Sequence, residues 1–211
     1  MFLTLLTIFS SSFVLALSGA LMPGPVLTVT VSESVRRGAI VGPLMILGHG
    51  ILELLLVFAL LAGLAPLFTR NEVFVVISLS GGGILLWMSY TMFRNLPDMK
   101  LDLSATDEKP RNLVLAGILL SIANPYWTIW WATIGIGYIV YSINYGISGI
   151  IAFYTGHILA DLAWYSMISY GIARGRDFFT DVFYRRLIAF CASFLLLFSF
   201  YFFYSGIEKI V

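Results

Sequence analysis

The sequence has few charged residues and a single cysteine, and both scarcities exclude whole classes of protein. Charged residues make up 11% of the chain, where a soluble domain carries about 25%. Apolar residues make up 60%, and the mean hydropathy is +0.95. Too few polar side chains remain to cover a water-facing globule of 211 residues, so lipid must solvate most of the surface. Cys191, as the only cysteine, permits neither an intramolecular disulfide nor a C-x-x-C motif.

The chain also lacks an excess of charge of either sign. Its formal net charge is +1, whereas nucleic-acid binding requires clustered basic surface. The zinc-protease motif His-Glu-x-x-His and the nucleophile elbow Gly-x-Ser-x-Gly are absent from the sequence. We therefore expect no nucleic-acid partner, no enzymatic activity and no cofactor.

Six apolar stretches are long enough to cross a bilayer as helices, which takes roughly 20 residues each. They cover residues 3–31, 39–68, 73–93, 113–141, 147–173 and 188–207. Polar segments separate them, and the first of these, at 32–37, is expected to form a loop. The sequence therefore predicts an all-α integral membrane protein with six transmembrane helices.

Lysine and arginine are distributed unevenly between the two sides that these spans define. The first, third and fifth connections hold ten of them, and the opposite side holds Arg70 and Lys209. The ten are Arg36, Arg37, Arg94, Lys100, Lys109, Arg111, Arg174, Arg176, Arg185 and Arg186. Because cytoplasmic loops carry the excess of Lys and Arg, both termini are predicted to be extracytoplasmic.

The chain divides into two halves of three spans each, residues 1–94 and 113–211, joined by a cytoplasmic linker at 95–112. Matching motifs occur at corresponding places in the two halves, as is common in transporters. Since three is an odd number, the second half must enter the membrane in the opposite sense. We therefore predict two inverted three-helix repeats.

Proline interrupts the first span of each half. Pro23, Gly24 and Pro25 lie in the first span, and Asn124 and Pro125 lie in the fourth. Proline removes a backbone donor and breaks a helix, and the freed backbone groups persist in a bilayer only beside protein or a wet cavity. Spans one and four are therefore predicted to be broken, and these five residues to bind the substrate near mid-membrane.

Both histidines of the sequence occur in the same motif, Gly-His-x-x-x-acid. His49 precedes Glu53 by four residues, and His157 precedes Asp161 by four, each near the middle of a span. Residues at this spacing share one face of a helix. Since ionisable groups inside a membrane are expensive and usually functional, the two pairs are candidate site residues.

Three interpretations of the two pairs are open. They can relay protons, since histidine titrates near neutral pH and burial in general raises the pKa of a carboxyl group toward that range. Two imidazoles and two carboxylates can also hold a divalent metal such as zinc or manganese. In the third interpretation, each histidine only hydrogen-bonds its own carboxylate and so neutralises polarity within the helix bundle.

These features resemble the lysine-exporter (LysE/RhtB-type) family of amino-acid efflux permeases over nearly the whole chain. Besides the proline motifs, the resemblance rests on motifs at the start of span two, in span three and in span five. These are Ser34-x-x-Arg37-Gly38, Gly82-x-x-Leu85-x-Trp87-Met88-Ser89-Tyr90 and Gly156-x-x-x-x-Asp161-x-x-Trp164.

The resemblance implies a secondary transporter that exports amino acids or related small solutes across a prokaryotic plasma membrane, by proton antiport. In that role His49, Glu53, His157 and Asp161 would couple transport to protons. The paired Gly-His motifs are not part of the family pattern, so a divalent metal-ion exporter using the same four residues stays the alternative. The partners are then the solute and the lipid bilayer, and a homodimer stays open.

A related thiol-disulfide electron carrier has a similar inverted repeat but needs cysteines beside its prolines. The corresponding positions here are Gly24 and Tyr126. Redox relay is therefore excluded by chemistry.

Overall fold

The computed structural model describes residues 1–65, 70–98, 112–175 and 180–210, and the regular structure within these ranges is helical. The α-helices are α1 (Phe2–Ala20), α2 (Pro25–Arg37), α3 (Val41–Ala59), α5 (Asn71–Asn95), α6 (Leu113–Ile122), α7 (Pro125–Trp130), α8 (Ile136–Ile143), α9 (Gly146–Gly175) and α10 (Asp181–Glu208). Five helical stretches are long and apolar enough to cross a membrane, or six when the bent pair formed by α6 and α7–α8 counts as one span. The predicted all-α membrane protein is confirmed.

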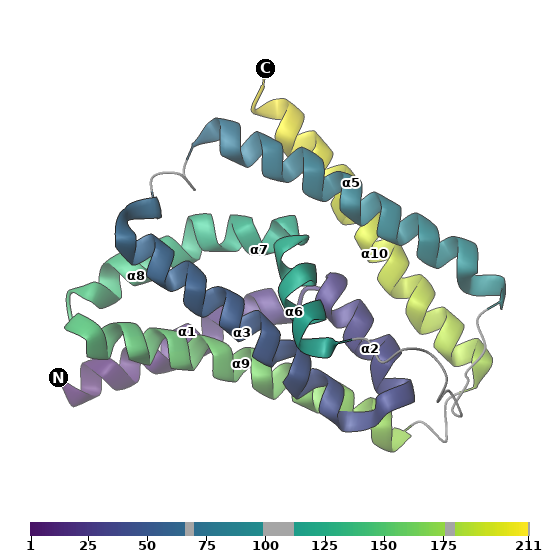
Figure 1. Cartoon of the computed structure of the whole chain (residues 1–211), viewed down its shortest axis with the longest axis horizontal. Helices are drawn as coiled ribbons and strands as arrows, with labels where there is room; N and C mark the ends of the chain where they lie inside the picture. The colour runs from purple at the N-terminus through teal and green to yellow at the C-terminus, as the bar shows by residue number, and fades with distance from the viewer. Residues whose placement is uncertain (66–69, 99–111, 176–179, 211) are drawn as a thin grey trace.

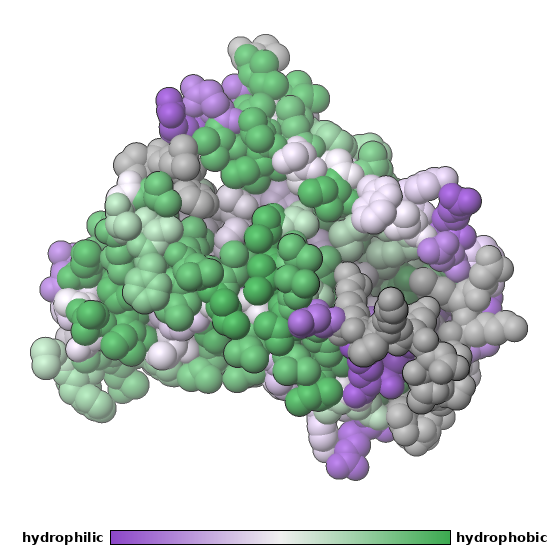
Figure 2. Space-filling model, viewed as in Figure 1, coloured by the Kyte–Doolittle hydropathy of each residue, from purple (hydrophilic) through white to green (hydrophobic). Residues whose placement is uncertain are grey.

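The outer surface of the helices is apolar, as a lipid environment requires. Figure 2 shows hydrophobic residues over most of the visible face, with hydrophilic residues gathered at its edges. Large side chains such as Trp87, Leu197 and Phe200 are exposed on α5 and α10. In a membrane these faces of α5 and α10 would contact lipid.

Two interruptions shape the middle of the molecule. The chain leaves helical geometry between α1 and α2, where Gly24 is extended, and Pro25 begins α2. It does so again between α6 and α7, where the two segments meet at a bend of 64° and Pro125 begins α7. Proline suits a first helical position because no backbone hydrogen bond is lost there.

The segment at 32–37 is helical, so its prediction as a loop was wrong. α2 continues through Arg37, and the chain turns at Gly38, whose φ of 78° lies in the left-handed region. Glycine adopts that conformation without a steric penalty. The buried Ser34 hydroxyl donates to the Thr30 carbonyl oxygen at 2.5 Å, so this polar side chain has its hydrogen-bond partner within the same helix.

The helices form two groups (Figure 1). α5 and α10 run side by side along one edge, where the Ser89 hydroxyl donates to the Ala192 carbonyl oxygen at 2.8 Å. α1, α3 and α9 form the other group, with α6 and α7 between the two. Tyr126 of α7 meets Phe198 of α10 edge-on at 6.2 Å between ring centroids. The broken helices therefore connect the two groups.

Glycine allows α3 and α6 to touch through their backbones. A Cβ on Gly48 would lie 1.9 Å from the Val114 carbonyl oxygen, and one on Gly117 would lie 2.1 Å from the Met45 carbonyl oxygen. Helices in membranes approach closely at such small residues. This contact fixes the position of His49, which follows Gly48, beside α6.

The described basic residues of the predicted cytoplasmic loops belong to helix ends at one side of the molecule. Figure 1 shows the end of α2, the end of α5, the end of α9 and the start of α10 at the same side. These ends carry Arg36, Arg37, Arg94, Arg174, Arg185 and Arg186. Lys100, Lys109, Arg111 and Arg176, with most of the predicted linker at 95–112, lie outside the described residues.

Candidate functional site

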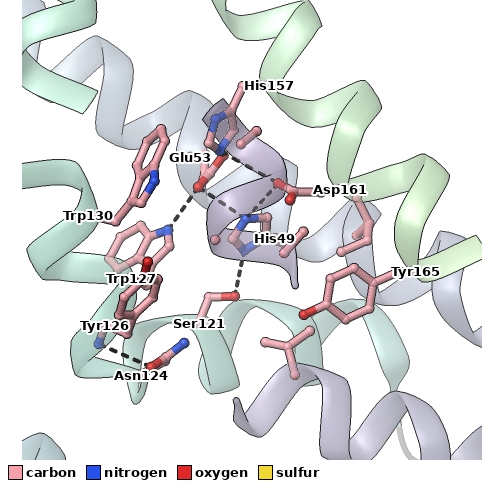
Figure 3. Close-up of a pocket in the computed structure, with 15 residues that line it drawn as sticks. His49, Glu53, Ser121, Asn124, Tyr126, Trp127, Trp130, His157, Asp161 and Tyr165 are labelled. Atoms are coloured by element: carbon pink, nitrogen blue, oxygen red, sulfur yellow. Dashed lines mark hydrogen bonds and ion pairs between the residues drawn. The ribbon is translucent and has the colours of Figure 1, made fainter. Parts of the chain in front are cut away.

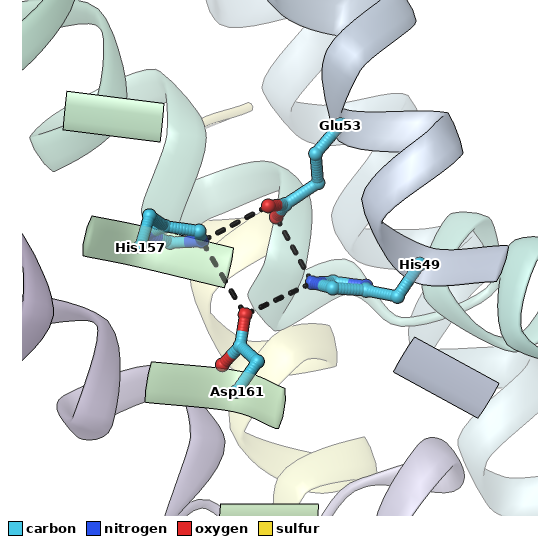
Figure 4. Close-up of side chains that lie close together, drawn as sticks. All are labelled: His49, Glu53, His157 and Asp161. Atoms are coloured by element: carbon cyan, nitrogen blue, oxygen red, sulfur yellow. Dashed lines mark ion pairs between the residues drawn. The ribbon is translucent and has the colours of Figure 1, made fainter. Parts of the chain in front are cut away.

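Two helices from different halves of the chain bring the four candidate ionisable residues together (Figure 4). α3 carries His49 and Glu53, and α9 carries His157 and Asp161. Within each helix the histidine Nε2 faces its own carboxylate, at 3.1 Å for Glu53 and 3.6 Å for Asp161. Across the helices, His157 Nε2 lies 3.0 Å from Glu53 Oε2, and His49 Nε2 lies 3.4 Å from Asp161 Oδ2. We call these four residues the quartet.

Glu53 is the most heavily bonded member of the quartet. The indole N–H groups of Trp127 and Trp131 donate to its Oε1 at 2.9 and 2.8 Å. The two imidazoles provide the contacts at 3.0 and 3.1 Å described above. Only 1% of Glu53 is exposed. Hydrogen bonds of this kind offset the free-energy cost of burying a carboxylate in an apolar interior.

His49 has a defined role for each ring nitrogen. Its Nδ1 lies 2.7 Å from the Ser121 hydroxyl, which also lies 2.7 Å from the Gly117 carbonyl oxygen. A carbonyl only accepts, so the single hydroxyl proton of Ser121 goes to Gly117, and the hydroxyl accepts from His49 Nδ1–H. His49 Nε2 is thereby left for the carboxylates.

His157 is enclosed by aromatic rings rather than by polar groups. The ring centroids of Trp130, Trp131 and Phe153 lie 4.7, 5.7 and 6.1 Å from that of His157. Its Nδ1 is buried and has no hydrogen-bond partner among the described residues. His157 therefore meets the polar part of the site through Nε2.

The quartet suits a divalent cation in ligand type and spacing but not in its outer contacts. One ligand atom from each residue falls within 4.8 Å of all the others, and ligand atoms of a tetrahedral zinc site lie about 3.3 Å apart. Metal-bound imidazoles almost always donate their other N–H to a partner. His49 does so through Ser121, whereas His157 has no such partner among the described residues.

The quartet lines a cavity of about 60 Å³ (Figure 3). One water needs about 10–15 Å³ of such space, so several waters or a small solute fit. Trp127 and Trp130 form one wall and Tyr165 the opposite one. Among the described residues the lining includes the quartet's two carboxylates and neither Lys nor Arg. The quartet therefore presents two carboxylates and two imidazoles to the cavity.

Comparison with known proteins gives the family. The family model described as "LysE type translocator" matches residues 17–206, which is most of the chain. The chain belongs to the LysE type translocator family. It is therefore a multi-pass membrane transporter, since a translocator moves solutes across a membrane.

Two relatives of the translocator cover much of its length. It is 23% identical over 209 residues to "Putative amino acid efflux protein YcgF" of Bacillus subtilis, covering 98% of this chain and 100% of that protein. It is 28% identical over 167 residues to "Chemotactic transduction protein ChpE" of Pseudomonas aeruginosa, covering 76% of this chain and 79% of that one. No solved structure matches the translocator significantly.

The proline-break residues of the translocator occupy several places. Asn124 lines the quartet's cavity, and its side chain caps α7 by accepting from the Tyr126 backbone N–H at 3.1 Å. Pro23, Gly24 and Pro25 line a second, apolar pocket beside α5 and α10, which Asn124 also lines. Pro125 is buried, with its ring against Gly81. Of these five residues, Asn124 alone lines both pockets.

Sequence reasoning missed Ser121 and Tyr165, and it did not assign Trp127 and Trp131 to the site. Trp127 and Trp131 are four residues apart, so they share one face of the helix after the break. That spacing was a usable signal. Ser121 carried no signal of its own, because its role depends on α3 packing against α6.

Proposed function

We propose that this translocator exports amino acids or related small solutes across a prokaryotic plasma membrane in exchange for protons. The observation that carries the proposal is the buried quartet at the edge of a cavity between the broken helices. Ionisable groups placed inside a membrane mark proton and substrate pathways. The amino acid efflux protein that the chain resembles supports the solute class.

The cavity offers complementary groups to a zwitterion. Gly24 caps α2 without any side-chain hydrogen bond, and Val26, at the first turn of α2, lines the cavity. The free amides and the positive end of the helix dipole favour a carboxylate there. Asp161, on the opposite helix, is available to an ammonium group. An α-amino acid carries both groups on one carbon, which suits a small cavity.

Proton coupling is supported by the continuity of the quartet. The Nε2 atoms of His49 and His157 each lie within 3.6 Å of both carboxylates. A proton can therefore pass among four groups without a large movement of any side chain. His and carboxylate chains of this kind relay protons in pumps and transporters.

The inverted repeat is supported by reciprocal contacts between the first span of one half and the second span of the other. Ser12 of α1 donates to the Phe153 carbonyl oxygen of α9 at 2.7 Å. Gly117 of α6 packs against the Met45 carbonyl oxygen of α3. Gly117 follows Ser12 by 105 residues, and Phe153 follows Met45 by 108.

A second pair of contacts has the same intervals. Gly48 of α3 packs against Val114 of α6, and Gly156 of α9 packs against Phe9 of α1. The interval between the glycines is again 108 residues, and that between their partners is again 105. Two broken helices related in this way would frame the cavity from opposite sides of the membrane.

The orientation proposed from the loops places both termini outside the cytoplasm. The described basic helix ends gather at one side of the molecule, away from the N-terminus (Figure 1). Positive residues concentrate on the cytoplasmic side of membrane proteins. Solute would therefore enter from the side where α2 turns into α3.

The test uses proteoliposomes loaded with a mixture of radiolabelled L-amino acids. An acidic outside buffer should accelerate release of at least one amino acid, and a protonophore should abolish the acceleration. Release no faster than from protein-free liposomes would refute the proposal. The same vesicles loaded with zinc or manganese test the metal-exporter alternative, which the amino acid efflux relative does not favour.

A further inference from the structure

We propose that the two carboxylates of the quartet have different tasks in the proposed proton exchange, on which this inference rests. Glu53 is a fixed anion that positions the two imidazoles. Asp161 is the carboxylate that takes up and releases the transported proton. The assignment follows from how many donors lie near each carboxylate and at what distance.

Glu53 Oε1 has no room for a proton. Each carboxylate oxygen offers about two lone-pair positions, and three nitrogen atoms lie within 3.1 Å of Oε1, whereas His157 Nε2 is the described nitrogen near Oε2, at 3.0 Å. Two of these nitrogens belong to the indoles of Trp127 and Trp131, which only donate. A proton on Oε1 would meet two N–H groups directed at the same atom. The two indole donors therefore stabilise the anionic form of Glu53, and no such donors reach the Asp161 oxygens at hydrogen-bond distance among the described residues.

Asp161 has weak contacts by comparison. His49 and His157 reach its Oδ2 at 3.4 and 3.6 Å, whereas a charge-assisted N–H···O bond measures about 2.7–2.9 Å. Its carboxyl group keeps lone pairs for a proton or a cation, and it lines the cavity. One O–H bond forms on Asp161 when a proton arrives from cavity water, and the same bond breaks when the proton leaves.

The surroundings of Asp161 favour this exchange. The described titratable groups that face it are His49 and Glu53 of α3 and His157 and Tyr165 of its own helix. α1 and α2, which also pack against α9, contribute apolar residues to the cavity lining, namely Ala16, Gly19, Ala20 and Val26. With Glu53 kept anionic, the charge of the site changes at Asp161 when solute and proton alternate.

The experiment separates coupling from movement of solute. Wild-type and variant proteoliposomes are assayed with the radiolabelled L-amino acid mixture in two ways: release driven by an acidic outside, and exchange of labelled for unlabelled amino acids at equal pH. Asp161→Asn, which mimics a permanently protonated side chain and also removes a charge from the ammonium site, should lose the acceleration by acid by a factor at least ten times its loss of exchange. Glu53→Gln should lose both activities together. Glu72→Gln, on an exposed carboxylate, is the matched control and should behave as wild type.

Retention of the acid-driven acceleration in Asp161→Asn would overturn the inference while leaving amino-acid export intact. If Asp161→Asn is inactive in both assays, Asp161→Glu decides: a retained response to acid supports the assignment, and its loss overturns it. Trp127→Phe, which keeps both carboxylates, should weaken exchange and acid-driven release by the same factor. A selective loss of the acid response in Trp127→Phe would place the transported proton on Glu53 instead. Failure of wild type to release any amino acid would refute the proposed function itself.

Discussion

The contact between α3 and α6 can be tested by adding one methyl group. In Gly48→Ala the new Cβ would lie 1.9 Å from the Val114 carbonyl oxygen and 2.8 Å from its carbonyl carbon. Both are backbone atoms, so no side-chain rotation relieves the clash. Ordinary van der Waals contact begins at 3.4 Å, and the helices must therefore separate by about 1.5 Å at this point, with overpacking typically costing about 1–3 kcal/mol.

The separation acts on the residue next to the substitution. His49 follows Gly48, and its Nδ1 reaches Ser121 on α6 at 2.7 Å. Moving α3 away by more than 1 Å would place the two atoms beyond hydrogen-bond distance. We therefore expect Gly48→Ala to lower both the melting temperature of the purified protein and the rate of amino-acid release.

Gly83→Ala is the matched control. A Cβ on Gly83 would meet nothing within 4 Å, and alanine stabilises a helix interior relative to glycine by about 0.5–1 kcal/mol. Its melting temperature should be equal to or above that of wild type, and its transport should be unchanged. Equal melting and equal transport in the two variants would refute the close backbone contact as the feature that positions His49.

Three further predictions concern the quartet and its neighbours. Ser121→Ala removes the acceptor of His49 Nδ1–H, and a lost hydrogen bond of about 1 kcal/mol should reduce amino-acid release about fivefold in the proteoliposome assay. Trp131→Phe keeps an aromatic ring but removes a donor to the Glu53 carboxylate. Thermal unfolding should show a loss of about 1.5–3 kcal/mol for this charged hydrogen bond, whereas Trp87→Phe, on an exposed tryptophan, should change nothing. Treatment with EDTA should leave acid-driven release unchanged, because the proton mechanism needs no metal; inhibition that zinc or manganese reverses would instead favour a metal at the quartet.

Much of this protein could be predicted from the sequence because the signals are local. A helix buries its own backbone hydrogen bonds, so apolar length alone predicts a membrane helix wherever it occurs. The spacing of four residues from His49 to Glu53 and from His157 to Asp161 places each pair on one helix face without any knowledge of the fold. The loop predicted at 32–37 was wrong for a local reason too. Its polar residues were interpreted as the end of a helix, but the helix continues through Arg37 and the chain turns at Gly38.

The tertiary structure alone decided which groups meet across helices. Glu53 and His157 are more than 100 residues apart, and they meet because glycines let α3, α6 and α9 pack closely. The 64° bend before α7 turns the face that carries Trp127 and Trp131 toward Glu53. Sequence spacing determines what one helix presents on each of its faces. Only packing determines what that face contacts. The two carboxylates, Glu53 and Asp161, therefore have different hydrogen-bond partners although their positions in the sequence motif are the same.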